Sequence, residues 1–176
     1  MKEFIKECIP YVIIVVLVVF IRSFIVTPVI VRGDSMYDTL NDGEVLFLSK
    51  ISYYVHDINR FDIVVIKDKD NDLIIKRVIG LPGDNVKYRD NVLYINGKEV
   101  KDIYNDDDTE DFDLQDICNI NNDECVSKIP SDKYLVLGDN RGVSADSRIK
   151  GLFDRDVILG KVVFRICSIN KIGIIK

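Results

Sequence analysis

Apolar residues are concentrated first in one segment near the N-terminus. Residues 8–21 contain no charged side chain, and apart from Arg22 the apolar character continues to Val26. As a helix rising about 1.5 Å per residue, residues 9–26 extend about 27 Å, close to the roughly 30 Å hydrocarbon core of a bilayer. The pattern predicts one transmembrane helix over about residues 9–26, within an N-terminal membrane anchor of residues 1–27.

Two other interpretations of this segment fit less well. A cleaved secretory peptide would end in small residues of the A-x-A type, and the residues after Phe20, IRSFIVTPVIV, contain no such pattern. A buried strand or core helix is the other alternative, but so long an apolar run at the extreme N-terminus is unusual for either. Lys2 and Lys6 precede the run while Arg22 and Arg32 follow it, so charge does not orient the anchor.

From Pro28 onward the pattern changes to short β-branched runs separated by Gly, Pro, Asn and Asp. The runs are VIVRG, EVLFLSKI, FDIVVIK, DLIIKRVIGL, NVLYINGKEV, KYLVLGD and VILGKVVFRI. Asn96-Gly97 is a strong signal for a two-residue hairpin turn. No long stretch carries an apolar stripe with the helical period. We therefore expect residues 28–176 to form a mostly β domain, an antiparallel sheet of barrel-like shape.

An acidic segment, expected to be an insertion over about residues 102–128, interrupts the β pattern. Ten Asp and Glu residues and no Lys or Arg lie between Asp102 and Cys125. We expect a solvated, mobile loop; a calcium site around Asp106–Asp108 is the weaker alternative, because the spacing and central Gly of an EF-hand loop are missing. Cys118 and Cys125 either close a small disulfide loop or remain free thiols, and the sequence leaves both open.

Composition narrows the classes of function. The 176-residue chain carries 24 Lys and Arg against 29 Asp and Glu, a net charge of −5, and this balance argues against a nucleic-acid-binding protein. Hydrophobic residues make up 47% of the chain, enough for a packed core. Because the chain has only one His, a multi-histidine metal site is excluded. We expect neither a metal nor a cofactor.

Three segments contain candidates for catalysis. Ser35 lies in the turn-like segment RGDSMYDTL, and a serine hydroxyl needs a base to become a nucleophile. The only histidine, His56, lies in a polar segment without a motif, so a Ser–His–Asp triad is the weaker hypothesis. Lys76 is flanked on both sides by apolar residues, and an inward-facing lysine there would have a lowered pKa suited to a base. Periodicity alone does not decide whether Lys76 faces inward.

The third segment, residues 137–151, has the sequence LGDNRGVSADSRIKG. Its Gly, Asp, Asn and Ser residues are typical of a loop with internal hydrogen bonds. Ser144 and Ser147 are candidate hydroxyl groups, and Asp146 and Arg148 are expected to form an ion pair.

Taken together, these segments resemble type I signal peptidases. GDSMYDTL, RFDIVVIK, KRVIGLPGD and LGDNRGVSADSR occur in that family's order and with roughly its spacing, the trailing GKVVFRI is also similar, and the match covers most of residues 30–166. The single anchor resembles the compact Gram-positive type. The resemblance implies a membrane-bound serine endopeptidase that removes signal peptides from secreted preproteins. It also implies a single-pass protein of the cell membrane, in contact with the lipid bilayer, with its catalytic domain on the extracytoplasmic side.

The resemblance assigns roles to individual residues. Ser35 matches the nucleophile, Lys76 the general base, and Ser144 the serine that hydrogen-bonds and orients the lysine. At Gly33 some members have a Ser whose hydroxyl donates to the oxyanion; here the Ser35 amide, with water or another amide, must serve. Asp146 and Arg148 match the acidic and basic residues that support the site in that family, and Arg77 is expected to interact with them. Asp139 and Asn140 match the family's GDN turn.

The resemblance also implies how substrates are held. It implies shallow pockets for small residues, typically Ala, at positions −1 and −3 from the cut. An apolar surface including Met36 and Tyr37 is expected to rest on the bilayer.

Two alternative functions remain. The first is a self-cleaving Ser/Lys protease of the SOS-repressor type, and the N-terminal anchor argues against it. The second is an inactive membrane-anchored binding domain, and the presence of both Ser35 and Lys76 argues against it.

Overall fold

The computed structural model describes most of the chain, namely residues 2–24, 26–50, 57–104, 109–121, 127–167 and 171–174. Three candidates named above, His56, Asp106–Asp108 and Cys125, lie outside the described residues.

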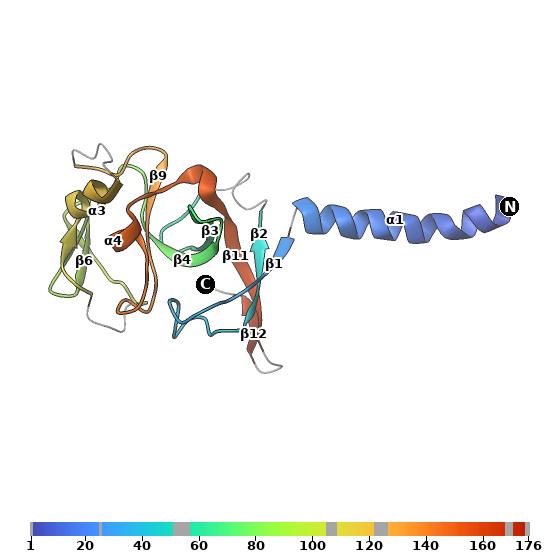
Figure 1. Cartoon of the computed structure of the whole chain (residues 1–176), viewed down its shortest axis with the longest axis horizontal. Coiled ribbons are helices and arrows are strands. Elements are labelled where there is room, and N and C mark those ends of the chain that lie inside the picture. The colour runs from blue at the N-terminus through green and yellow to red at the C-terminus, as the bar shows by residue number, and fades with distance from the viewer. Residues whose placement is uncertain are drawn as a thin grey trace.

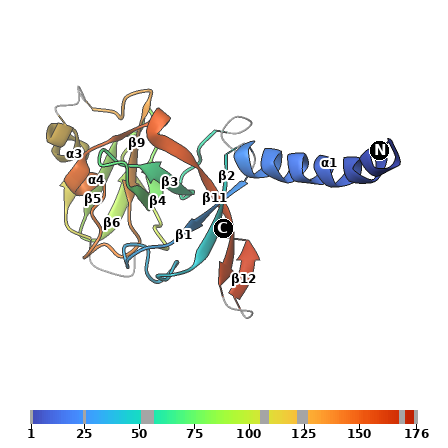
Figure 2. The same cartoon turned by 45° about the vertical axis from the view of Figure 1, so that its right-hand side comes forward.

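A long helix, α1 (Lys2–Phe24), precedes the β domain and projects away from it (Figures 1 and 2). Its apolar side chains from Ile9 to Val19 are mostly exposed, because no other element covers them. Within the part of the chain that the structure describes, no helix combines the length and the apolar character that a membrane crossing requires.

The larger of two antiparallel sheets curls into a half-barrel (Figure 2). Its strands follow the order β1-β2-β11-β3-β4-β9-β10, and β12 also pairs with β11. The late strand β11 therefore lies between the β1–β2 pair and the β3–β4 pair, and all these pairs are antiparallel. The mostly antiparallel β prediction is confirmed. The strands are β1 (Val26–Ile30), β2 (Val45–Ser49), β3 (Ile63–Lys67), β4 (Leu73–Gly80), β9 (Lys133–Leu137), β10 (Phe153–Asp154), β11 (Ile158–Cys167) and β12 (Lys171–Ile174).

A second, smaller sheet has the order β7-β6-β5-β8. Asn96 and Gly97 join β6 to β7 and both adopt positive φ angles, 53° and 76°, so the predicted hairpin is confirmed. A buried cluster that includes Tyr88 and Leu135 joins this sheet to the larger one. The strands are β5 (Val86–Arg89), β6 (Val92–Ile95), β7 (Lys98–Val100) and β8 (Phe112–Asp113).

The acidic segment is more ordered than expected. Residues 112–121 form β8 and the helix α3 (Leu114–Asn121), so the prediction of a mobile loop is wrong for this part. Leu114, Ile117 and Cys118 lie on one face of α3 and are buried in the core. Cys118 is disulfide-bonded, so the free-thiol alternative is wrong for it; its predicted partner lies outside the described residues.

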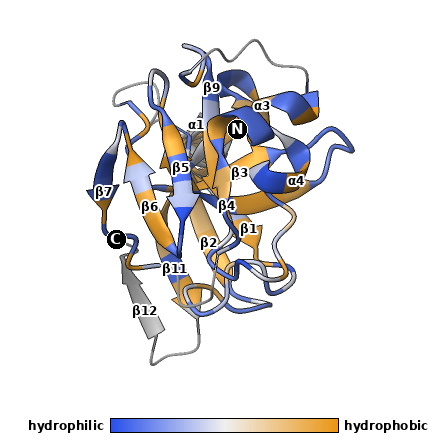
Figure 3. Cartoon of the chain, turned by 90° about the vertical axis from the view of Figure 1, so that its left-hand side faces the viewer, coloured by the Kyte–Doolittle hydropathy of each residue, from blue (hydrophilic) through white to orange (hydrophobic). Residues whose placement is uncertain are grey.

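Two short helices follow β9 in the chain. Helix α4 (Ser147–Lys150) and the 3₁₀ helix η1 (Arg155–Val157) connect β9, β10 and β11. Figure 3 shows hydrophobic residues along the strands of the larger sheet and hydrophilic residues on α3 and α4. Strand β4 lies inside that sheet between β3 and β9, with Lys76 opposite Val64. From Ile75 to Gly80 the residues of β4 are buried, whereas Leu73 at its start is exposed.

Candidate functional site

Ser35 lies in the loop between β1 and β2. Backbone hydrogen bonds close the ends of this loop, and two of its apolar side chains pack in the core. The Val31 and Gly43 amides donate to the Glu44 and Val31 carbonyls. Met36, 1% exposed, is packed in the core together with Leu40. The expected apolar surface therefore does not include Met36, whereas the neighbouring Tyr37 is exposed.

Lys76 on β4 faces inward and is 3% exposed. Its Nζ lies 2.7 Å from Ser35 Oγ, in hydrogen-bonding contact. Burial lowers the pKa of Lys76 from 10.5 to about 8, while the nearby Asp146 and Asp139 raise it and Lys150 and Arg148 lower it further. The structure thus settles the direction that periodicity left open, and it brings together the two residues predicted as nucleophile and base.

Ser144 is buried close to Ser35, but its hydroxyl makes no hydrogen bond with any described residue. The hydrogen bond to Lys76 that the resemblance implied is therefore not made. A Cβ atom at Gly138 would collide with the Ser144 hydroxyl and with the Ser35 carbonyl oxygen, so only glycine permits this close approach. The other candidate hydroxyl, that of Ser147, instead accepts a hydrogen bond from the Val136 amide at 2.9 Å.

Asp146 and Arg148 form the predicted ion pair. Arg148 Nη2 lies 2.9 Å from Asp146 Oδ2, and the same guanidinium donates to the Arg141 carbonyl at 2.7 Å. Asp146 also caps α4 and accepts the Gly138 amide at 3.0 Å. The pair therefore braces the loop that lies against Ser35.

Arg77 does not join this pair, contrary to the prediction. Its Nε and Nη2 donate to the two carboxylate oxygens of Asp139 at 2.8 and 2.7 Å, and both side chains are buried. Thr39 donates to Asp139 Oδ2 at 2.6 Å, and the Arg77 guanidinium lies 3.4 Å above the Tyr104 ring. Asp139 and Asp146, both in the 138–148 loop, thus belong to two separate ion pairs.

Asn140 and Ser35 are joined through their backbones, because the Asn140 amide donates to the Ser35 carbonyl at 3.2 Å. Gly33 adopts a positive φ of 79°, and its amide donates to Asp42 Oδ1 at 2.7 Å. The Ser35 amide, in contrast, makes no hydrogen bond with any described residue. Of these two amides, that of Ser35 is available to an oxyanion.

Arg141 is a structural residue of the site that sequence reasoning missed. Its buried guanidinium donates to the Gly138 carbonyl at 2.8 Å, to the Tyr88 hydroxyl at 2.9 Å and to Asp102 Oδ2 at 2.6 Å. These contacts tie the 138–148 loop to the smaller sheet. The sequence did contain a hint of this contact. Asp102 begins a segment without Lys or Arg, so a basic partner for it has to come from elsewhere in the chain.

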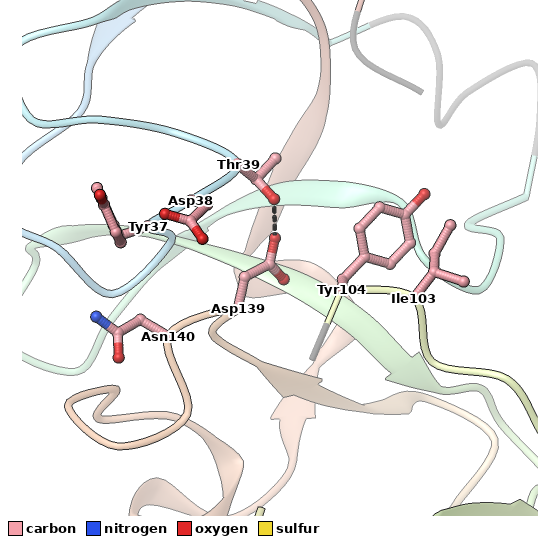
Figure 4. A pocket seen from close by; sticks show the side chains of 7 residues that line it. All are labelled: Tyr37, Asp38, Thr39, Ile103, Tyr104, Asp139 and Asn140. Atoms are coloured by element: carbon pink, nitrogen blue, oxygen red, sulfur yellow. Dashed lines mark hydrogen bonds between the residues drawn. The ribbon is translucent and has the colours of Figure 1, made fainter. Parts of the chain in front are cut away.

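Ser35 and Lys76 open onto a cleft of about 470 Å³. A pocket of about 70 Å³ adjoins it, and both residues line this pocket together with Ile30, Val31 and Ile75. A further hollow of about 360 Å³ is shown in Figure 4. The cleft is further lined by Arg32, Gly33, Asp34, Ile74, Asn140, Val143, Ala145 and Lys150.

Comparisons with known proteins agree with this geometry. Residues 1–167 match the family model described as "Signal peptidase, peptidase S26". Signal peptidase IB of Staphylococcus aureus is 42% identical over 173 residues, covering 93% of this chain and 90% of the relative. Signal peptidase I of Bacillus licheniformis is 42% identical over 163 residues, covering 92% and 87%.

A solved structure points to the same family. The crystal structure of a signal peptidase I from Enterococcus faecalis aligns with a TM-score of 0.52 at 34% identity, covering 60% of this chain and 97% of that one. The resemblance found in the sequence is therefore confirmed, and the chain belongs to the signal peptidase family, peptidase S26.

Proposed function

We propose that this protein removes signal peptides from secreted preproteins, with Ser35 as the nucleophile and Lys76 as the general base. The observation that carries the proposal is the 2.7 Å contact between Lys76 Nζ and Ser35 Oγ. Burial lowers the pKa of that lysine to about 8, so a substantial fraction is neutral near physiological pH. Such a contact between a buried lysine and a serine hydroxyl is what a Ser/Lys protease requires.

The chemistry follows from these two groups. Neutral Lys76 takes the proton of Ser35 as Oγ attacks the scissile carbonyl carbon. The resulting ammonium then gives its proton to the leaving amine, and an acyl-enzyme remains. In the second half, Lys76 takes a proton from water, the hydroxide attacks the ester, and Ser35 recovers its proton.

The oxyanion of each tetrahedral intermediate is stabilised by the Ser35 amide. This amide has no acceptor among the described residues, and it belongs to the nucleophile itself. One such donor contributes roughly 3–4 kcal/mol in enzymes where it has been removed. Gly33 supplies no side chain and its amide is engaged with Asp42, so it does not take part in this hole.

The preprotein lies extended in the cleft beside residues 30–33 and 73–76. Both segments line the small pocket, and its volume of about 70 Å³ suits a side chain as small as that of alanine. Backbone pairing along an extended strand provides affinity, while the pocket provides specificity. We assign the residues before the cut to this side of the cleft.

The N-terminal helix is the proposed means of membrane attachment. Residues 1–27 form the anchor, with about residues 9–26 in the bilayer, and residues 28–176 form the catalytic domain on the extracytoplasmic side. The support is the exposed apolar surface of α1 between Ile9 and Val19, which no part of the β domain covers. Retention of the protein in membranes after alkaline extraction, together with protease access to the β domain from outside intact cells, tests this placement.

Two alternatives considered from the sequence are not favoured. A self-cleaving repressor-type protease and an inactive binding domain both fit poorly with a signal peptidase match over residues 1–167. The family to which the chain belongs consists of serine proteases, so serine hydrolase activity is expected of it.

Incubation of the purified full-length protein with a preprotein tests the proposed function. We expect one cut at the signal-peptide junction, and we expect Ser35→Ala and Lys76→Ala each to lose nearly all of it, because nucleophile and base act as a unit. Lys76→Arg is expected to fail too, since a guanidinium stays protonated. His56→Ala is the control and should retain cleavage. Substantial cleavage by a folded Ser35→Ala or Lys76→Ala variant refutes the assignment, and loss in His56→Ala revives the triad.

A further inference from the structure

The hollow in Figure 4 adjoins the catalytic cleft, because Asn140 lines both. Residues 30–33 line the small pocket together with Ser35 and Met36, whereas residues 37–39, which follow in the same loop, line this hollow. The nucleophile loop therefore runs from one to the other. The hollow has a volume of about 360 Å³ and is lined by Tyr37, Asp38, Thr39, Ile103, Tyr104, Asp139 and Asn140.

The hollow carries one uncompensated negative charge. Asp139 is neutralised by Arg77, and Thr39 also donates to it. Asp38 is exposed and makes no hydrogen bond or ion pair with any described residue. The side-chain amide of Asn140 is likewise unpaired among the described residues. A ligand entering the hollow thus meets a free carboxylate and a free amide.

The remaining walls are apolar and aromatic. Tyr37 and Ile103 are both more than half exposed, and Tyr104 lies next to Ile103. Figure 4 shows the polar residues Asp38, Thr39 and Asp139 between Tyr37 and Asn140 on one side and Ile103 and Tyr104 on the other. An alkyl chain can lie along such walls while a cationic end group reaches a carboxylate, as lysine and arginine side chains do on protein surfaces.

A peptide held for cleavage has to continue on both sides of Ser35. Under the proposed function, the residues before the cut lie beside residues 30–33 and 73–76, which line the small pocket. The residues after the cut then pass towards the other hollow, which adjoins the cleft at Asn140. An extended chain advances about 3.3 Å per residue, so a hollow next to the nucleophile is within reach of the first few residues.

We infer that this hollow binds the start of the mature protein and favours a lysine or arginine side chain at one of the first three positions after the cut. The inference rests on the proposed function, since it names a second specificity site for the same cleavage. Asp38 is its specificity-determining residue, and Tyr37 and Ile103 hold the alkyl part of the cationic side chain.

A peptide series tests the inference. All members share one signal sequence and an alanine mature segment, in which Lys or Glu replaces alanine at each of the first three positions in turn. At one position at least, we expect kcat/KM for Lys to exceed that for Glu by roughly five- to tenfold, the size of one exposed ion pair gained and one repulsion avoided. The preference is expected to shrink in high salt, because exposed charges are screened.

Substitution of Asp38 provides the decisive comparison. Asp38→Asn keeps the shape of the side chain and is expected to abolish the Lys-over-Glu preference, and Asp38→Lys is expected to reverse it. Asp156→Asn is the matched control: Asp156 is exposed on η1 and lines none of the three hollows, so its removal should leave the preference intact.

The outcomes separate the inference from the function on which it rests. Cleavage of the alanine peptide without any charge preference, or a preference that survives in Asp38→Asn, overturns the inference and leaves the proposed function standing. Failure of the wild-type enzyme to cut even the alanine peptide at the junction overturns the proposed function, and the inference with it.

Discussion

At the scale of single residues, the proposed role of Lys76 as the general base predicts how the rate depends on pH. The amine acts as a base only when neutral, and its proton is lost as pH rises through the lowered pKa of about 8. We therefore expect kcat/KM to rise with pH along an acid limb near that value and to level off above it. Single-turnover rates on one preprotein over a range of pH provide the measurement. A limb near 10.5, the ordinary value for lysine, would show that Lys76 is not the buried base.

Substitution of Lys150 is expected to shift the acid limb of this pH profile. Lys150 lines the same cleft, and its positive charge lowers the pKa of Lys76. In Lys150→Gln the pKa of Lys76 is expected to rise, so the acid limb shifts to higher pH and the rate at neutral pH falls. Lys87→Gln, on the exposed side of β5 in the smaller sheet, is the control and should leave the limb in place. A limb that stays put in Lys150→Gln contradicts this electrostatic account.

Sequence motifs pointed to the proposed catalytic residues, which the structure places in contact, but they did not predict how the surrounding side chains contact one another. The segments containing Ser35 and Lys76 were identifiable, but the burial of Lys76 was not, because it depends on tertiary packing over both faces of β4: Lys76 and Arg77 point to opposite faces and are 3% and 0% exposed. The partner of Arg77 was predicted wrongly for a similar reason. Arg77 and Asp139 are 62 residues apart, and the pairing of β4 with β9 brings them together.

At the scale of elements, the buried ion pair between Arg141 and Asp102 joins the 138–148 loop to the smaller sheet. The two side chains are 0% and 4% exposed. Arg141→Met leaves a buried carboxylate without its counter-charge, so we expect a loss of about 3–5 kcal/mol in the free energy of unfolding. Urea unfolding followed by circular dichroism measures it.

A second variant separates the pair from general damage to the core. In the double variant Arg141→Met with Asp102→Asn, neither charge of this pair remains. The loss in the free energy of unfolding should therefore be clearly smaller than the sum of the losses in the two single variants. Additive losses would mean that Arg141 and Asp102 do not stabilise the fold as a pair.

Most strands were predictable because their β-branched runs are bounded by turn residues, and Asn96-Gly97 marked its hairpin correctly. Helix α3 was not predictable in the same way. It has only eight residues, and its three buried apolar residues, Leu114, Ile117 and Cys118, occur within a strongly acidic segment of the sequence. Tertiary packing against the smaller sheet, rather than a long periodic pattern, stabilises this helix.

At the scale of the whole molecule, the helix α1 and the β domain are expected to be separable. The residues that form the site all lie in the β domain, and α1 projects away from it. Deletion of residues 2–24 should therefore leave a folded protein that cleaves a short soluble peptide at a similar rate. Cleavage of a preprotein embedded in lipid vesicles is expected to fall at least tenfold, because the enzyme is no longer concentrated at the membrane.

Comparison of the two substrates with the full-length and shortened proteins provides the measurement. Equal loss on both substrates would show that α1 supports the fold or the site instead. The deletion retains β1, which begins at Val26, slightly before the predicted domain boundary at residue 28. The sequence placed that boundary where the short β-branched runs begin, at Pro28, and in the structure β1 pairs with β2 from Val26 to Ile30.

The position of β11 has a consequence for when the enzyme becomes active. Ser35 follows β1 and Lys76 lies on β4, but in the sheet these two hairpins are joined only through β11, which is among the last strands to be synthesised. A chain still emerging from the ribosome carries both proposed catalytic residues without the strand that joins their hairpins. We therefore expect proteolytic activity to arise only when synthesis is nearly complete, so that the growing chain is spared an active protease at its own N-terminal end.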